Sequence, residues 1–127
     1  MATKTLNKYT VAEASNLQVY ENYSSETITI NDDSTWDYSG DNEGDGVNDW
    51  NASGDGLAKE VNFIPISGTN GDTVTFALNI NGSWGDDIAV KFDDFPITIS
   101  NILISQVRMK STDGAGGSEI FEVLSFH

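Results

Sequence analysis

The 127-residue chain has no cysteine, one histidine and only six basic residues. Without cysteine it can form no disulfide, and it has neither a thiol nucleophile nor a thiolate metal ligand. The one histidine is His127, so neither a histidine-based catalytic triad nor a site with several histidine ligands is expected. No apolar run of about 18 residues occurs, and no apolar stretch follows the first basic residues. We therefore expect a soluble protein without enzymatic activity. No signal peptide is seen, so the protein either stays where it is made or has had a signal removed upstream of these residues.

The charge of the chain is strongly negative and unevenly distributed. Twenty acidic residues against six basic ones give a formal net charge of −14. Such a surface repels nucleic-acid phosphates and anionic lipid headgroups, so neither is an expected partner. Lys4 and Lys8 are basic, whereas residues 9–58 contain no base. Residues 1–8 are therefore interpreted either as a basic assembly arm that reaches an acidic neighbour, such as another copy of the chain, or as a solvated terminus.

Most of the chain alternates apolar and polar residues with a period of two, which is typical of β-strands. Residues 72–81 give the clearest example, because turn-forming Asn-Gly sequences lie on both sides of them. One face of that strand is predicted to carry Val74, Phe76, Leu78 and Ile80. The same pattern predicts strands at residues 26–31, 61–66, 88–92 and 119–126.

The stretch from Ile97 to Lys110 is longer, and its alternation slips near Ser100-Asn101. That slip predicts a bulge or a bend between two sheets. Helix signals are weak, and residues 113–118 predict a hairpin loop before the last strand. Several short strands in succession predict an all-β fold, an antiparallel β-sandwich of jelly-roll type, formed as one domain by residues 9–127.

Residues 31–56 contain eight acidic residues and no base, and part of this segment has the spacing of a calcium loop. In the nine residues from Asp41 to Asp49, oxygen ligands stand at positions 1, 3, 5 and 9, glycine stands at position 6, and a main-chain carbonyl is available at position 7. The predicted metal ligands are Asp41, Glu43, Asp45, Val47 and Asp49. Their mutual repulsion would be reversed by a bound divalent cation. The alternative is a solvated loop whose Asp, Asn and Gly residues serve turns and solubility.

This nine-residue pattern resembles the calcium-binding repeat of thrombospondin type 3 and, more loosely, EF-hand and dockerin loops. The resemblance implies a structural Ca²⁺ ion held by the four acidic side chains. The sequence departs from an EF-hand at position 12, where Ala52 replaces the bidentate glutamate, and from thrombospondin repeats in having a single copy.

Aromatic residues supply a second candidate site. Trp36 and Tyr38 are two residues apart on a strand-like stretch and are predicted to share a face, while Trp50 and Trp84 lie in polar stretches. Aromatic rings beside acids and amides are suited to stacking on sugars, so Trp36, Trp50 and Trp84 are candidate carbohydrate-binding residues. The alternative is that they belong to the hydrophobic core.

The acid pairs Asp86-Asp87 and Asp93-Asp94 do not predict a glycosidase, because adjacent aspartates do not supply carboxylates across a cleft. Two functions remain. The first is a structural subunit of a larger assembly, such as a decoration or cement protein on a bacteriophage capsid, located at the virion surface and bound to other subunits. The second is a calcium-stabilised carbohydrate-binding module or lectin-like domain.

Overall fold

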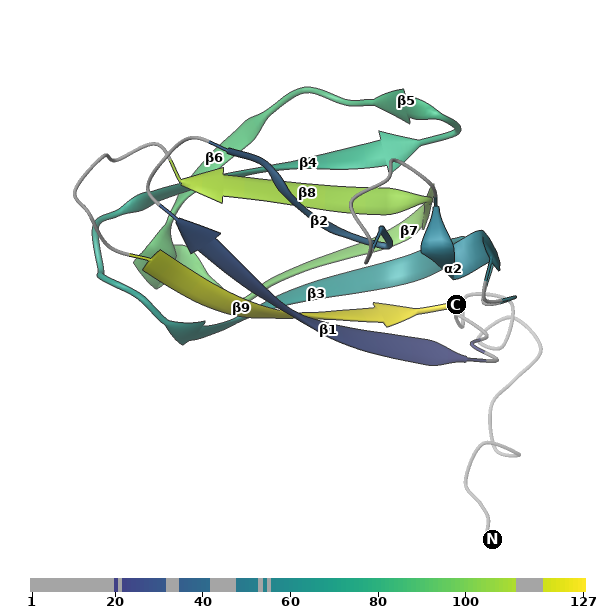
Figure 1. Ribbon diagram of the computed structural model, residues 1–127, viewed down its shortest axis with the longest axis horizontal. Coiled ribbons are helices and arrows are strands. Elements are labelled where there is room, and N and C mark those ends of the chain that lie inside the picture. The colour runs from purple at the N-terminus through teal and green to yellow at the C-terminus, as the bar shows by residue number, and fades with distance from the viewer. Residues whose placement is uncertain are drawn as a thin grey trace, which may run out of the picture.

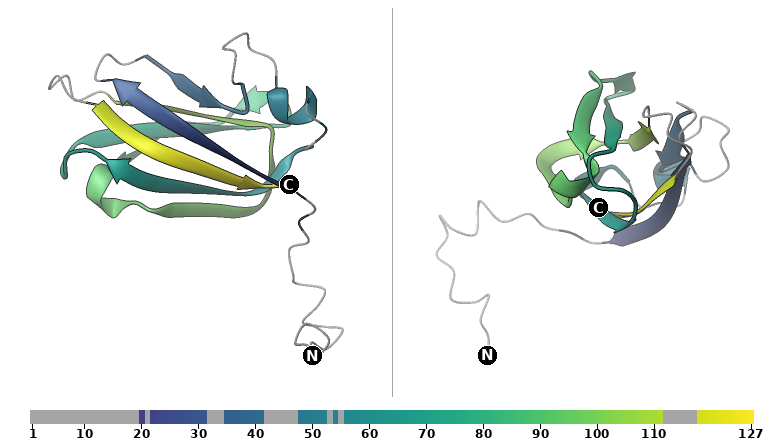
Figure 2. Two further views of the ribbon diagram at one scale, coloured as in Figure 1. Left: turned by 60° about the horizontal axis from the view of Figure 1, so that its bottom comes forward. Right: turned by 90° about the vertical axis from the view of Figure 1, so that its left-hand side faces the viewer.

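The computed structural model describes residues 20, 22–31, 35–41, 48–52, 54, 56–111 and 118–127. Two antiparallel β-sheets face each other and enclose the hydrophobic core (Figures 1 and 2). The predicted all-β sandwich is therefore confirmed. The predicted arm with Lys4 and Lys8 lies outside the described residues. Within the described part of the chain, no helix is long and apolar enough to cross a membrane.

The first sheet, called sheet A here, has the strand order β1-β9-β3-β7. Its strands are β1 (Tyr23–Asn31), β9 (Ser118–Phe126), β3 (Ala58–Ser67) and β7 (Ile97–Ile104). The pairing of β1 with β9 runs without a register shift from Tyr23 opposite Phe126 to Asn31 opposite Ser118. The strands predicted at residues 26–31, 61–66 and 119–126 are therefore present in sheet A.

The second sheet, sheet B, has the order β2-β8-β4-β5, and β6 also pairs with β4. Its strands are β2 (Asp37–Ser39), β8 (Gln106–Ser111), β4 (Thr73–Ile80), β5 (Ser83–Trp84) and β6 (Ile88–Lys91). A 3₁₀ turn, η2 (Phe92–Asp94), follows β6, and one short helix, α2 (Asp49–Ala52), precedes β3.

The core is built from alternate side chains of both sheets, as the period-two pattern predicts. On β4, Val74, Phe76 and Leu78 are buried in the core and Ile80 packs against it. Five phenylalanines form a connected group. The ring of Phe63 lies 4.8 Å from that of Phe76 and 6.5 Å from that of Phe95. The ring of Phe121 lies 4.8 Å from that of Phe95 and 5.5 Å from that of Phe92. This packing fixes the inner faces, so any binding function must lie on the outer faces, loops and edges.

The irregularity predicted near Ser100-Asn101 is present, both as a bulge and as a bend between sheets. The pairing of β3 with β7 shifts register between Ala58 and Glu60, and Asn101 has a φ of 63°. The chain then leaves sheet A at Ile104 and enters sheet B at Gln106. The Ser105 amide and hydroxyl between them both donate to the Asn79 carbonyl, at 2.8 and 3.1 Å, which fixes this corner against β4.

The predicted hairpin loop at residues 113–118 is wrong in one respect. β8 belongs to sheet B and β9 to sheet A, so the connection between them crosses from one sheet to the other instead of joining paired neighbours. Alternation along a strand identifies its inner face but does not identify the strand beside it, because both kinds of connection use the same turn residues.

Candidate functional site

The two ends of the acidic loop are held together. The Asp49 amide donates a hydrogen bond of 2.6 Å to the Gly40 carbonyl, and the Gly40 amide donates to the Glu26 carboxylate at 3.2 Å from Oε1. Asp41 is buried, with 4% of its surface exposed. The hydrogen bond between Asp49 and Gly40 therefore brings the two ends of the predicted calcium pattern, Asp41 and Asp49, close together. Glu26 adds a carboxylate beside these ends, and the spacing of the loop sequence gives no sign of it.

The remaining predicted ligands, Glu43, Asp45 and Val47, lie outside the described residues. Among the described side chains, no group of three or more histidine, cysteine or acidic residues has a geometry that could hold a metal. Calcium binding by the loop therefore stays a prediction.

Trp50 is buried in the core beneath the base of this loop, where its indole contacts Gly40. It lies on α2 with 2% of its surface exposed, and its ring meets that of His127 at a centroid distance of 5.0 Å. A Cβ built on Gly40 would lie 3.1 Å from the Trp50 indole, so the loop backbone passes directly over the ring. Of the two interpretations of Trp50, carbohydrate site or hydrophobic core, the structure supports the core, and its burial leaves no ring face for a sugar.

His127 has a structural environment of the same kind. Its Nε2 lies 3.0 Å from the Ser125 hydroxyl oxygen, and its Nδ1 lies 3.0 Å from the Gly56 carbonyl oxygen. A carbonyl can only accept, so Nδ1 carries the proton toward Gly56. Ser125 is 1% exposed and His127 is 3% exposed. This serine–histidine pair lies where a substrate has no access, and it ties the end of β9 to the segment before β3.

The outer face of sheet B carries an aromatic–cationic cluster, formed by Trp36, Tyr38, Trp84, Arg108 and Lys110. The Arg108 guanidinium carbon lies 4.2 Å from the centroid of Trp36 and 4.3 Å from that of Trp84. The Lys110 ammonium lies 4.3 Å from the centroid of Trp36, and the rings of Tyr38 and Trp84 meet at 5.9 Å. The guanidinium plane can stack on both indoles because cations are attracted to ring faces.

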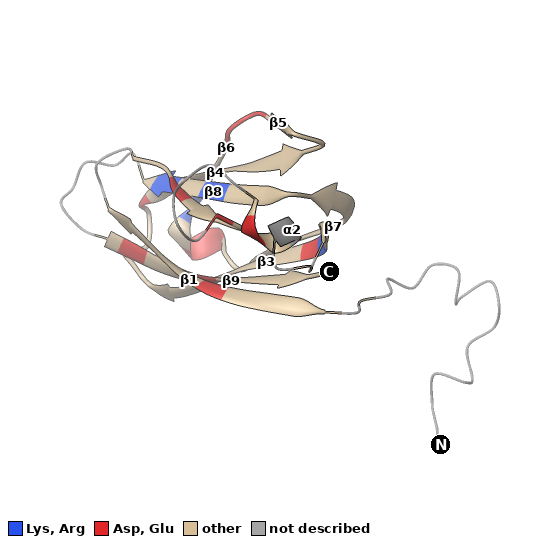
Figure 3. Ribbon diagram, turned by 45° about the vertical axis from the view of Figure 1, so that its right-hand side comes forward, with Lys and Arg blue, Asp and Glu red and all other residues tan. Residues whose placement is uncertain are grey.

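Strand register explains how this cluster forms. Tyr38 of β2 pairs with Arg108 of β8, and Arg108 pairs with Ala77 of β4. Trp84 of β5 pairs with Asn79, which lies two residues after Ala77 on β4. Arg108 also lies 4.0 Å from the Asp87 carboxylate, and Figure 3 shows basic positions on β8 near the acidic connection between β5 and β6. Arg108 occupies ring surface that a sugar would otherwise use, so Trp36 and Trp84 do not form an open stacking platform.

The second acid pair contributes to a turn. The Asp93 carboxylate accepts a 2.9 Å hydrogen bond from the Gly71 amide, and the Lys91 ammonium donates to the Gly71 carbonyl at 3.0 Å. Because these groups link η2 to the turn before β4, Asp93 has a structural contact of its own.

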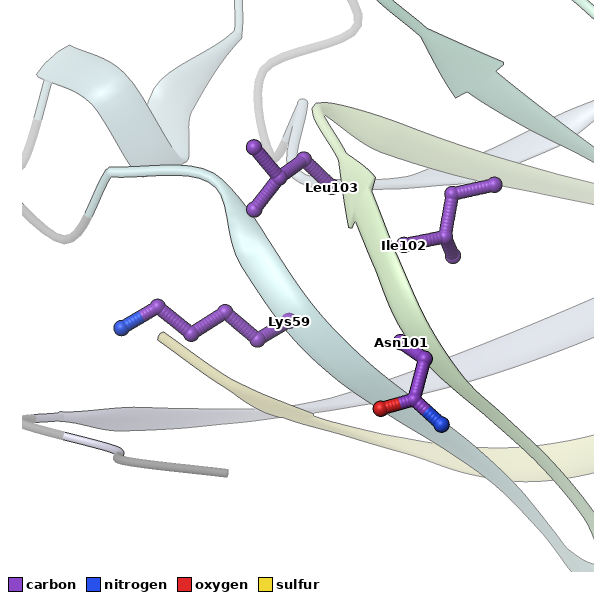
Figure 4. A pocket seen from close by; sticks show the side chains of 4 residues that line it. All are labelled: Lys59, Asn101, Ile102 and Leu103. Atoms are coloured by element: carbon purple, nitrogen blue, oxygen red, sulfur yellow. The ribbon is translucent and has the colours of Figure 1, made fainter. Parts of the chain in front are cut away.

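Two clefts, each of about 410 Å³, open on the surface of the described residues. One lies at the bulge, where Lys59 of β3 faces Asn101, Ile102 and Leu103 of β7 (Figure 4). The other lies at the corner between β7 and β8 and is lined by Asn48, Leu57, Asn79, Asn81, Gly82, Ser105 and Gln106. The linear sequence gives little sign of the second cleft, since its residues come from separate loops and strand ends.

The outer face of sheet A carries several exposed apolar side chains. Ile64 and Ile66 on β3 are 37% and 57% exposed, and Tyr23 on β1 is 66% exposed. By register, Ile64 pairs with Glu122, and the adjacent outward positions of β9 are the half-buried Ile120, Leu124 and Phe126. We call this set the sheet A apolar face: Tyr23, Ile64, Ile66, Ile120, Leu124 and Phe126.

Tyr20 packs on one end of the sheet A apolar face. Its ring lies 5.1 Å from that of Phe126, and its hydroxyl donates a 2.8 Å hydrogen bond to the Glu60 carboxylate. Burial, that hydrogen bond and the negative charge of Glu60 raise the pKa of Tyr20 to about 12. This contact shows that the face accepts an aromatic side chain from a segment outside the sheet.

No family model, curated protein or solved structure matched the chain. The function is therefore inferred from the geometry of the chain itself.

Proposed function

We propose that the chain is a non-enzymatic structural subunit of a larger assembly, of the kind that decorates or cements a bacteriophage capsid. It would act at the virion surface through contacts with other protein subunits, including copies of itself. The observation that carries this proposal is the sheet A apolar face. Its three most exposed members are Tyr23, Ile64 and Ile66. Exposed apolar side chains that gather on one sheet face are a feature of protein contact sites.

Strand order supports the jelly-roll form of the sandwich. Without the two-residue β5, the described strands are eight in chain order, of which sheet A takes the first, eighth, third and sixth and sheet B takes the second, seventh, fourth and fifth. This interleaving is that of two Greek keys, and jelly rolls of this size occur in viral capsid proteins and lectins. Fold alone does not determine function, so the apolar face remains the main support.

The edge of sheet A offers a second contact. Among the described strands, β1 lies at the edge of sheet A: it pairs with β9 on one side and has nine residues without lysine, proline or a register shift. A regular edge strand of this kind can accept an additional strand from another chain. In the proposed assembly, the basic arm containing Lys4 and Lys8 reaches the acidic body of a neighbour, because the two have opposite charge.

The proposal is tested by the size of the species in which the native chain occurs. Extracts or particle preparations from the source are separated on a density gradient, and the chain is detected by immunoblotting. The proposal predicts that it sediments with large particles and that particles without it lose heat or salt resistance. Sedimentation only as a free 13.7 kDa protein, with particles unaffected by its deletion, would contradict the proposal.

A further inference from the structure

The corner cleft between β7 and β8 is chemically different from the rest of this acidic molecule. Among the residues that the structure describes, seven line it, including three asparagines, one glutamine and one serine, and none of these seven carries a charge. The chain as a whole has 20 acidic residues and a net charge of −14. The amide and hydroxyl groups of these described residues match the donors and acceptors of a neutral polar ligand.

The cleft is held in shape before any ligand arrives. The Ser105 amide and hydroxyl both donate to the Asn79 main-chain carbonyl, which leaves the Asn79 side chain to the cleft lining. The Gly85 amide donates to the Leu78 carbonyl at 2.9 Å and closes the β4–β5 hairpin on the other side. Figure 1 shows α2 and the β4–β5 turn at the same end of the sandwich. Groups fixed in this way need little ordering when they bind.

Asn79 gives a second, independent indication of a ligand. Its side chain is 8% exposed, and its Oδ1 is buried without a hydrogen-bond partner among the described residues. Buried polar atoms are nearly always satisfied, and leaving one unsatisfied costs about 1–3 kcal/mol. An acceptor of this kind in the wall of a cleft can be satisfied by a hydroxyl donor of a ligand after a small rotation of the amide.

An aromatic ring stands beside these amides. Trp84 pairs directly with Asn79 across β4 and β5, so both residues project from the same face of the sheet. Arg108 lies over the Trp84 ring at 4.3 Å and fixes its orientation. Because Arg108 occupies that ring surface, contacts to a ligand come from the amides of the cleft, which can exchange hydrogen bonds with the hydroxyls of a sugar.

We propose that the amide-lined cleft, with Asn79, Asn81, Ser105 and Gln106 as hydrogen-bonding groups, binds a neutral oligosaccharide. Its volume of about 410 Å³ lies within the range of roughly 300–1,000 Å³ that is typical of small-ligand sites. This binding goes beyond the role of a structural subunit and does not depend on it, because the cleft lies at the corner of sheet B and the apolar face lies on sheet A.

The test uses the full chain, labelled with ¹⁵N, and follows its amide resonances during titration with a panel of short neutral gluco-, manno- and galacto-oligosaccharides. At least one of them is expected to shift the side-chain amides of Asn79, Asn81 and Gln106. A sialylated oligosaccharide is expected to shift none of them, because the acidic surface repels it. If no neutral oligosaccharide shifts these resonances at about 10 mM, the proposal is overturned. A response to a short peptide amide alone also overturns it.

A matched pair of variants locates the site. Asn81 and Asn101 have similar left-handed φ values, 56° and 63°, so glycine keeps the backbone of either one unstrained while removing its amide. Asn81 lines the amide cleft and Asn101 lines the cleft at the bulge. Asn81→Gly is expected to weaken binding by at least about tenfold, and Asn101→Gly by less than about twofold. Equal affinities in the two variants would overturn the assignment to this cleft.

Discussion

Replacing Gly40 by alanine tests how the acidic loop is anchored. Gly40 has a φ of 84°, and its missing Cβ would lie 3.1 Å from the Trp50 indole and 3.2 Å from the Ser105 carbonyl oxygen. Alanine in the left-handed region costs about 1–2 kcal/mol. Pressing an extra methyl group into a packed site costs about 1–3 kcal/mol more. We therefore expect Gly40→Ala to lower the free energy of unfolding by about 2–5 kcal/mol.

Gly82 is the matched control. Its φ of 82° is nearly the same, but a Cβ there would meet nothing within 4 Å. Gly82→Ala should therefore lose only the backbone component, about 1–2 kcal/mol. Urea unfolding followed by tryptophan fluorescence gives the free energy of unfolding of both variants. Since about 1 kcal/mol corresponds to roughly 4 °C, the melting temperatures of Gly40→Ala and Gly82→Ala should differ by about 4–12 °C. Equal losses in the two variants would refute the contact between Gly40 and Trp50.

Further predictions concern the loop, Tyr20 and Arg108. Millimolar Ca²⁺ should raise the melting temperature, and Asp45→Ala should abolish this rise because it removes a predicted ligand. If neither Ca²⁺ nor a chelator changes the melting curve, the calcium site is excluded. The pKa of Tyr20 is raised from 10.0 to about 12, so its contribution to the free energy of unfolding is fully present below pH 10 and is lost as the pH rises toward 12. Tyr20→Phe should therefore make stability depend less on pH above pH 10. An unchanged pH dependence would contradict the hydrogen bond with Glu60. Arg108→Lys should lower the free energy of unfolding by about 1–2 kcal/mol and alter tryptophan fluorescence, because an ammonium cannot stack on Trp36 and Trp84 at once. An unfolding curve and spectrum identical to those of the unmodified chain would argue against the aromatic–cationic cluster.

The parts of the fold that follow from local alternation were predictable. The inner face of β4 and the irregularity near Asn101 could be read directly, because burial imposes a period of two and a bulge breaks it. The connection after β8 could not, since the choice of neighbouring strand depends on contacts far apart in the sequence. The sequence left Trp50 open between the core and a carbohydrate site for a similar reason. Its sequence neighbours are polar, whereas the residues that enclose it, Gly40 and His127, are distant in the chain.

The candidate sites divide in the same way. The spacing from Asp41 to Asp49 is a local pattern and predicts a loop. The structure describes the base of this loop, where the Asp49 amide bonds to the Gly40 carbonyl. The stacking of Arg108 between Trp36 and Trp84 depends on the register of three strands, so no local pattern contains it. The amide cleft also has no linear motif, because Asn79 and Gln106 meet only through the pairing of β4 with β8.

The central claim, that the chain is an assembly subunit which binds through the sheet A apolar face, is tested most directly by adding purified variants to particles that lack it. The variant with Ile64→Asp and Ile66→Asp places charge on that face, and Ile88→Asp places charge on an isoleucine of sheet B that is 42% exposed. Bound and free protein are separated by sedimentation and quantified. We predict that the double variant loses at least about 90% of particle binding, a tenfold effect, whereas Ile88→Asp binds like the unmodified chain. Full binding by the double variant would contradict the proposed function.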